Sequence, residues 1–148
     1  MTPHAARTSE IESPTAYLPA DETAACGARA HVTAHLLFAG APSAVVDEAE
    51  LLTSEVVDDA VAGRVPGPVL VRVEPAPAGW AVLVEWLDEH DPAPGDEGYL
   101  PLTGTDPAAR RRRDALERSP ARWRVTDDGL VTTVRIELDR PPLTSPLR

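Results

Sequence analysis

Two acidic side chains on one helix-like stretch could form the wall of a chemical site. Glu55 and Asp59 are four residues apart, and residues at that spacing are neighbours on a helix surface. At 3.6 residues per turn they fall beside the apolar side of this stretch and not opposite it. Two carboxylates there are either a pair of solvated acids or part of a site, and spacing alone favours the solvated pair.

Two other groups of residues have spacings that could bind a ligand. His31 and His35 are four apart, as metal ligands on a helix can be, but the neighbouring sequence supplies no third ligand, which favours a solvated helix face. The run from Arg110 to Arg113 could address a phosphate. Four successive residues point around the whole helix, so only one or two can reach one ligand, and a solvated face is again favoured.

The acidic pair lies on a stretch with a clear helical period. Apolar residues between Ser43 and Ala62 recur at spacings of three and four, which predicts one amphipathic helix with Ser43 as its cap. An earlier helix is predicted over 22–38, with Asp21 as its N-cap. The stripe expected to face the core is formed by Val45, Ala49, Leu52, Val56 and Ala60.

The rest of the chain alternates as strands do. Strands are predicted over 68–74 and 80–87, joined by a hairpin loop over 75–79, and over 122–126 and 130–138, joined by a turn. Between these pairs lie an acidic, Pro- and Gly-rich segment over 88–104, expected to be a mobile loop, and a helix from Pro107 to about residue 118. Short connections between strands predict a mixed, mostly antiparallel sheet with the helices on one face, an α/β two-layer sandwich.

Composition limits the class of protein. The 148 residues predict one domain over 21–138, a loose leader over 1–20 in which Tyr17 and Leu18 could form a short edge strand, and a loose tail over 139–148. The formal net charge of -10 disfavours nucleic acid as a partner. Because the sequence has a single cysteine, no apolar membrane span and no signal peptide, it predicts a cytoplasmic protein with no membrane partner.

Three motifs stand in a recognisable order along the chain. Residues 54–61 read S-E-V-V-D-D-A-V, residues 84–88 read V-E-W-L-D, and residues 133–138 read T-V-R-I-E-L after a turn at Gly129. Together with the order of elements, they resemble the ATPase fold shared by DNA gyrase B, sensor histidine kinases and mismatch-repair ATPases. More narrowly, the chain from Ala24 to Leu138 is similar to the small bacterial anti-sigma-factor serine/threonine kinases.

The resemblance implies a role for each matching residue. In the family, a Glu at the place of Glu55 polarises the attacking water or hydroxyl, and an Asn at the place of Asp59 holds the Mg²⁺ that bridges the phosphates of ATP. An Asp can also ligate Mg²⁺, because this ion prefers oxygen. The family's Asp at the place of Asp88 accepts a hydrogen bond from the adenine amino group. The family's Thr, for which Thr133 is the expected counterpart, holds a water against the adenine.

The phosphate end departs from the family pattern. The family opens its third helix with a G-x-G-L type turn, whose backbone N–H groups cradle the phosphates. Here residues 106–113 contain no glycine, and Pro107 removes one backbone donor. Arg110 and Arg113 are then the side chains that could reach a nucleotide phosphate.

Two functions from different classes follow as expectations. The resemblance implies an ATP-binding regulatory protein that acts on a sigma factor or an anti-sigma antagonist and, if active, is an ATP-dependent protein serine/threonine kinase. The alternative is a catalytically inactive interaction module that keeps the fold and binds a protein, with weak nucleotide binding or none. The phosphate turn without glycine favours the module. The oligomeric state stays open, and a homodimer is compatible with the sequence.

Overall fold

The computed structural model describes residues 14–63, 65–87, 107–119 and 121–141. Its elements are, in chain order, β1 (Thr15–Leu18), α2 (Ala24–Phe38), α3 (Ser43–Ala62), β2 (Val69–Ala76), β3 (Gly79–Leu87), α4 (Pro107–Arg118), β4 (Arg122–Asp127) and β5 (Val131–Asp139).

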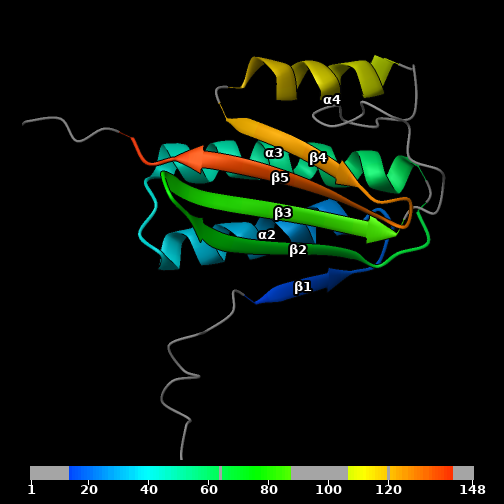
Figure 1. The fold of residues 1–148 in the computed structure, drawn as a ribbon, viewed down its shortest axis with the longest axis horizontal. Helices are drawn as coiled ribbons and strands as arrows, with labels where there is room; N and C mark the ends of the chain where they lie inside the picture. The colour runs from blue at the N-terminus through cyan, green and yellow to red at the C-terminus, as the bar shows by residue number, and fades with distance from the viewer. Residues whose placement is uncertain (1–13, 64, 88–106, 120, 142–148) are drawn as a thin grey trace, which may run out of the picture.

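Helices and strands form the two layers that the sequence predicts. The five strands lie in the order β1-β2-β3-β5-β4, and each neighbouring pair among the described strands is antiparallel, so the sheet is not mixed. Figure 1 shows α2 and α3 on one face of this sheet and α4 on the β4 side of the molecule. The two-layer α/β sandwich with its helices on one face is therefore confirmed.

Helix α3 forms because its apolar stripe has a surface to cover. It begins at Ser43 and ends at Ala62, as predicted, and Val45, Ala49, Leu52, Val56 and Ala60 are all buried. The predicted cap is wrong: the N-cap is Pro42, and Ser43 is the first helical residue.

The predicted cap of α2 is also wrong. Helix α2 begins at Ala24, with Thr23 as the N-cap. The carboxylate of Asp21 instead accepts hydrogen bonds from the Thr23 backbone N–H and hydroxyl, at 2.8 and 2.6 Å. The Asp21 carboxylate is therefore used in a short Asx-type turn before the helix and does not cap the first turn of α2.

The hairpin between β2 and β3 is tighter than predicted. The expected five-residue loop over 75–79 is wrong, because Pro75 pairs with Trp80 and Ala76 pairs with Gly79, which leaves only residues 77 and 78 as the turn. A two-residue hairpin is closed by a hydrogen-bonded pair, so the adjacent Pro75–Trp80 pair needs no N–H directed at β3. Strand β1 pairs with β2 only as far as Arg72, so no described strand lies opposite the Pro75 nitrogen. This position tolerates proline for that reason.

The core lies between the helices and one face of the sheet. Alternate residues of the central strands point toward α2 and α3, and Trp80 and Trp86 are each 5% exposed there. The fully buried side chains of these strands include Val69, Val71, Val82, Val84, Val134 and Ile136. The opposite face of the sheet, called the open face below, has no described helix on it.

The limits of the domain differ slightly from the prediction. Strand β1 pairs with β2, so the sheet begins within the segment that the sequence assigns to a leader, and β5 ends at Asp139. Residues 88–104, predicted as a mobile loop, lie outside the described residues. Within the described ranges, no helix has both the length and the apolar character that a bilayer crossing requires.

Candidate functional site

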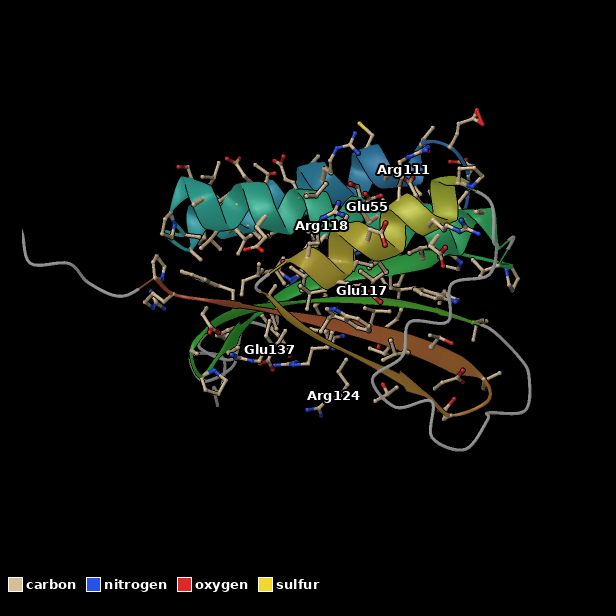
Figure 2. The ribbon with its side chains drawn as sticks, turned by 90° about the horizontal axis from the view of Figure 1, so that it is seen from above. Glu55, Arg111, Glu117, Arg118, Arg124 and Glu137 are labelled. Carbon is tan, nitrogen blue, oxygen red and sulfur yellow. The ribbon has the colours of Figure 1, made fainter. Side chains whose placement is uncertain are left out.

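Helix α3 places the two carboxylates in the helix layer. Asp59 lies in the last turn of α3 and is 4% exposed, whereas Glu55, one turn earlier, is half-buried. The sequence predicts both at the edge of the apolar stripe, but the structure brings Asp59 into the buried part of the helix. Figure 2 shows Glu55 among the helices, on the other side of the sheet from Arg124 and Glu137.

The predicted adenine contact, Thr133, lies on the open face. It is the cross-strand partner of Glu85, and its hydroxyl donates a hydrogen bond of 3.1 Å to Glu85 Oε2. Both side chains line a cavity of about 420 Å³, together with Thr126, Asp127, Asp128 and Val131. Because the sheet separates this face from α3, the structure does not bring Thr133 together with Glu55 and Asp59.

The neighbouring residue, Thr132, occupies the helix-facing position instead. It is fully buried opposite Trp86, and its Oγ1 has no hydrogen-bond partner among the described residues. A buried hydroxyl without a partner costs free energy, so each instance calls for a reason. Sequence reasoning missed Thr132, although the alternation of Val134, Ile136 and Leu138 already assigns it to the buried side of the strand.

The remaining predicted binding residues are less well placed by the structure. Asp88 lies outside the described residues, as does the side chain of Arg113. Helix α4 begins at Pro107, as predicted, and the Arg110 side chain is exposed in its first turn. The assignment of Arg110 and Arg113 to phosphate binding stays a prediction.

The two histidines of α2 are accounted for by local contacts. Their rings lie 4.4 Å apart, and His31 Nε2 hydrogen-bonds to the Pro14 carbonyl oxygen at 3.0 Å. Burial lowers the pKa of His31, which favours the neutral ring. No group of three potential metal ligands occurs in the part of the chain that the structure describes.

A network of ion pairs crosses the open face. Arg135 of β5 bonds to Glu74 of β2 and to Glu137, each at 2.9 Å, and Arg122 of β4 bonds to Glu137 and Asp139, each at 3.0 Å. Arg135 can reach Glu74 across β3 because Ala81, the β3 residue between Glu74 and Glu137, has a small side chain. Hydrogen bonds from Arg135 and Arg122 lower the pKa of Glu137 below its ordinary value of 4.5.

This network predicts an acid-sensitive part of the stability. A carboxylate whose pKa is lowered by folding stabilises the folded state above its ordinary pKa of 4.5, and this contribution is lost as the pH falls through the lowered value. We therefore expect the free energy of unfolding to fall less steeply with acid in Glu137→Gln than in the wild type. Urea unfolding from pH 7 to pH 3 measures this, with the exposed Glu22→Gln as the control. The prediction would be contradicted if the free energy of unfolding fell equally steeply below about pH 5 in the wild type and in Glu137→Gln.

In comparisons with known proteins, no family model matches this chain and no curated protein matches it.

Proposed function

We propose that this protein is an ATP-binding regulatory protein of the histidine-kinase-like ATPase type that acts on a partner protein. The observation that supports it best is the buried Asp59, with Glu55 one turn earlier on the same helix. The resemblance gives these two carboxylates the roles of metal ligand and proton acceptor at the nucleotide site. The partner is of the sigma-factor or anti-sigma-antagonist type, and a protein in this role acts in the cytoplasm.

The residues present fit Mg²⁺ and ATP at the end of α3. Magnesium is usually held by one or two carboxylates completed by phosphate and water oxygens, so Asp59 is sufficient as the protein's ligand. Figure 1 shows that α3 ends and β5 begins at the same end of the sandwich. Asp59 and Thr132 lie near these two ends. The Thr132 hydroxyl has no partner among the described residues, which makes Thr132 a better candidate for the adenine contact than Thr133.

Each chain residue has a defined task in this proposal. Asp59 holds the metal ion, Thr132 and Asp88 orient the adenine, and Glu55 accepts a proton from the attacking hydroxyl. Bound Mg²⁺ would supply charge compensation for the phosphates. Arg110 and Arg113 are the candidates for direct phosphate contacts.

A second function is favoured by one specific observation. Helix α4 opens with Pro107, which has no N–H to offer a phosphate. Each backbone donor to an anion contributes about 1.5–3 kcal/mol. A phosphate-binding turn that lacks two of them should therefore have a Kd for ATP that is higher by about two to four powers of ten. A protein-interaction module with little or no turnover is therefore the alternative.

Isothermal titration with Mg-ATP, ADP and metal-free ATP separates the two functions. We expect weak binding that requires Mg²⁺, with a Kd in the high-micromolar range or poorer, and little turnover. Asp88→Asn should abolish the binding, and Asp59→Asn, which restores the family's residue, should strengthen it or leave it unchanged. Tight binding with brisk phosphorylation would overturn the proposal of a weakened site, as would a loss of affinity in Asp59→Asn. If no nucleotide binds at all, the protein-interaction module is the function that the result supports.

A further inference from the structure

Two arginines lie directly opposite each other on the open face. Arg124 of β4 and Arg135 of β5 are cross-strand partners, which places their Cβ atoms about 5 Å apart on the same side of the sheet. Like charges in this position destabilise a sheet. Arg135 is compensated by Glu74 and Glu137, but no hydrogen bond or ion pair to Arg124 is found among the described residues. The exposed Arg124 guanidinium can donate charge-assisted hydrogen bonds to an external carboxylate or phosphate.

A groove surrounds this arginine pair at the edge of the sheet. The cavity has a volume of about 460 Å³, and its lining includes the four consecutive residues 121–124. Because successive strand residues point to opposite faces, a cavity lined by all four must run along the edge of the strand. β4 is the last strand of the sheet, and β5 lies on its other side, so this edge is the outer one.

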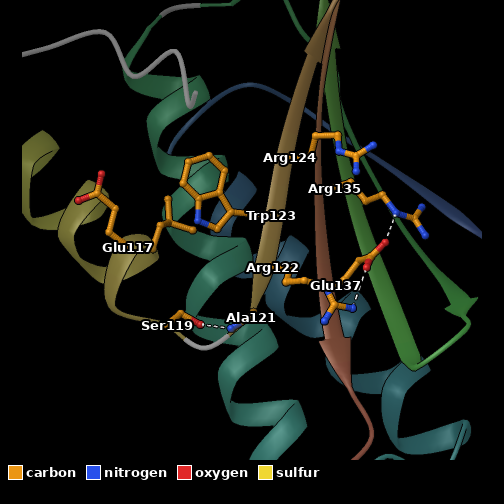
Figure 3. Close-up of a pocket in the computed structure, with 9 residues that line it drawn as sticks. Glu117, Ser119, Ala121, Arg122, Trp123, Arg124, Arg135 and Glu137 are labelled. Atoms are coloured by element: carbon orange, nitrogen blue, oxygen red, sulfur yellow. Dashed lines mark hydrogen bonds and ion pairs between the residues drawn. The ribbon is translucent and has the colours of Figure 1, made fainter. Parts of the chain in front are cut away.

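The groove has two different walls. Figure 3 shows Arg124 and Arg135 pointing to one side of β4, while Trp123 points to the other side, toward α4. Arg122 joins the arginines on the first wall, and Leu116 and Ala121 join Trp123 on the second. One wall therefore carries three arginines, two of them paired with Glu137, and the other wall is apolar.

The main chain of β4 completes the groove. The Asp128 N–H bonds to the Val131 carbonyl oxygen, and the alternation of an antiparallel ladder then directs the main-chain groups of Trp123 away from β5. No partner for these groups is found in the described ranges. Val125, two residues further, is 3% exposed, so the accessible edge is short.

Helix α4 holds the far wall of the groove in place. The Ser119 hydroxyl donates a hydrogen bond to Glu48 of α3, and the Ala121 N–H donates to Ser119 Oγ at 3.0 Å. These contacts tie the end of α4 and the start of β4 to the helix layer. The groove is therefore attached to the folded domain through α4 and α3.

We infer that this groove binds a short extended segment of a partner protein in which acidic and apolar residues alternate. Side chains of an extended segment alternate between two sides, so its carboxylates would meet Arg124 while its apolar residues meet Trp123 and Leu116. Its main chain would add to the edge of β4 at Trp123. A second copy of β4 would instead bring further arginines against Arg124, so charge disfavours self-pairing. The inference does not require nucleotide, so it can fail or succeed independently of the proposed function.

Two peptides of the same composition test the inference without ATP. The sequences are acetyl-Glu-Leu-Glu-Leu-amide, which alternates, and acetyl-Glu-Glu-Leu-Leu-amide, which does not. The readout is the indole N–H resonance of Trp123 during titration of the full chain, with the buried Trp80 and Trp86 as internal references. We expect the alternating peptide to shift Trp123 selectively and to bind more tightly than its isomer, with an affinity that falls as salt is added.

Matched variants locate the charged contact. Arg124→Gln should lower the affinity for the alternating peptide about fivefold, as the loss of an exposed ion pair does. Arg29→Gln, which removes an exposed arginine from α2, should leave the affinity unchanged. Glu117→Gln removes an acid from the rim of the groove and should tighten binding. Melting curves check that all three variants are folded.

Three results would overturn the inference. Equal affinities for the two peptides would show that alternation is not recognised, and an unchanged affinity in Arg124→Gln would show that the arginine pair is not the anchor. The same Trp123 shift with inorganic phosphate alone, or with a short DNA duplex, would identify a general anion site and not a peptide groove.

Discussion

Leu52→Ala is expected to lower the free energy of unfolding by about 2–5 kcal/mol, because a fully buried leucine leaves a cavity when it is truncated. Leu52 is 0% exposed at the centre of the α3 stripe. Its neighbour Leu51 is 51% exposed, so Leu51→Ala is a control with the same chemical change on the same helix. Surface substitutions of this kind usually change stability by no more than about 0.5 kcal/mol. Urea denaturation of the two variants measures the difference.

The comparison tests which side of α3 faces the sheet. A loss below about half a kcal/mol in Leu52→Ala would show that the stripe does not form the core face. Similar losses in both variants would show instead that α3 is buried all round. The peptide and nucleotide experiments both depend on a folded chain, so this measurement also sets the stability against which their variants are judged.

Thr132→Val and Thr133→Val are expected to change stability in opposite directions. Thr132 has a buried hydroxyl with no described partner, so its replacement by the similarly shaped valine should raise the free energy of unfolding by about 1–3 kcal/mol. The Thr133 hydroxyl donates to Glu85, so its loss should lower the free energy by about 0.5–1.5 kcal/mol. Thermal or urea unfolding without nucleotide measures both.

The same pair of variants decides which threonine serves the nucleotide. If Thr132 contacts the adenine, Thr132→Val weakens the binding of ATP while it stabilises the free protein. This trade-off is expected of a residue kept for function. Thr133→Val should then bind ATP as the wild type does. A loss of ATP affinity in Thr133→Val alone would contradict the assignment, and destabilisation by Thr132→Val would show that its hydroxyl is satisfied in solution.

Much of the architecture could be predicted from local patterns. The stripe from Val45 to Ala60 recurs at the helical period, and that period alone places α3 and its buried face. The alternation from Val69 to Val73 and from Val134 to Leu138 likewise identifies strands. Short connections between paired strands require antiparallel neighbours, which fixes the two hairpins. These features depend on residues close together in the chain, so the sequence states them directly.

Element ends were predicted less well. Asp21 and Ser43 have the side chains that caps prefer, but one bonds within a turn and the other lies inside its helix. Pro75 looks like a loop residue, yet the strand continues through it because its nitrogen faces no partner strand. Each outcome depends on which donors and acceptors meet after folding, and residue type alone does not specify that.

The sequence by itself determined the order of elements, the apolar faces and the candidate carboxylates of α3. Only the tertiary structure decided that Asp59 is buried, that Thr133 faces away from it, and that Arg124 stands beside Arg135. Burial and cross-strand register depend on which surfaces meet between segments distant in the chain. Local periodicity is set within a few residues, so it does not specify which distant segments come into contact.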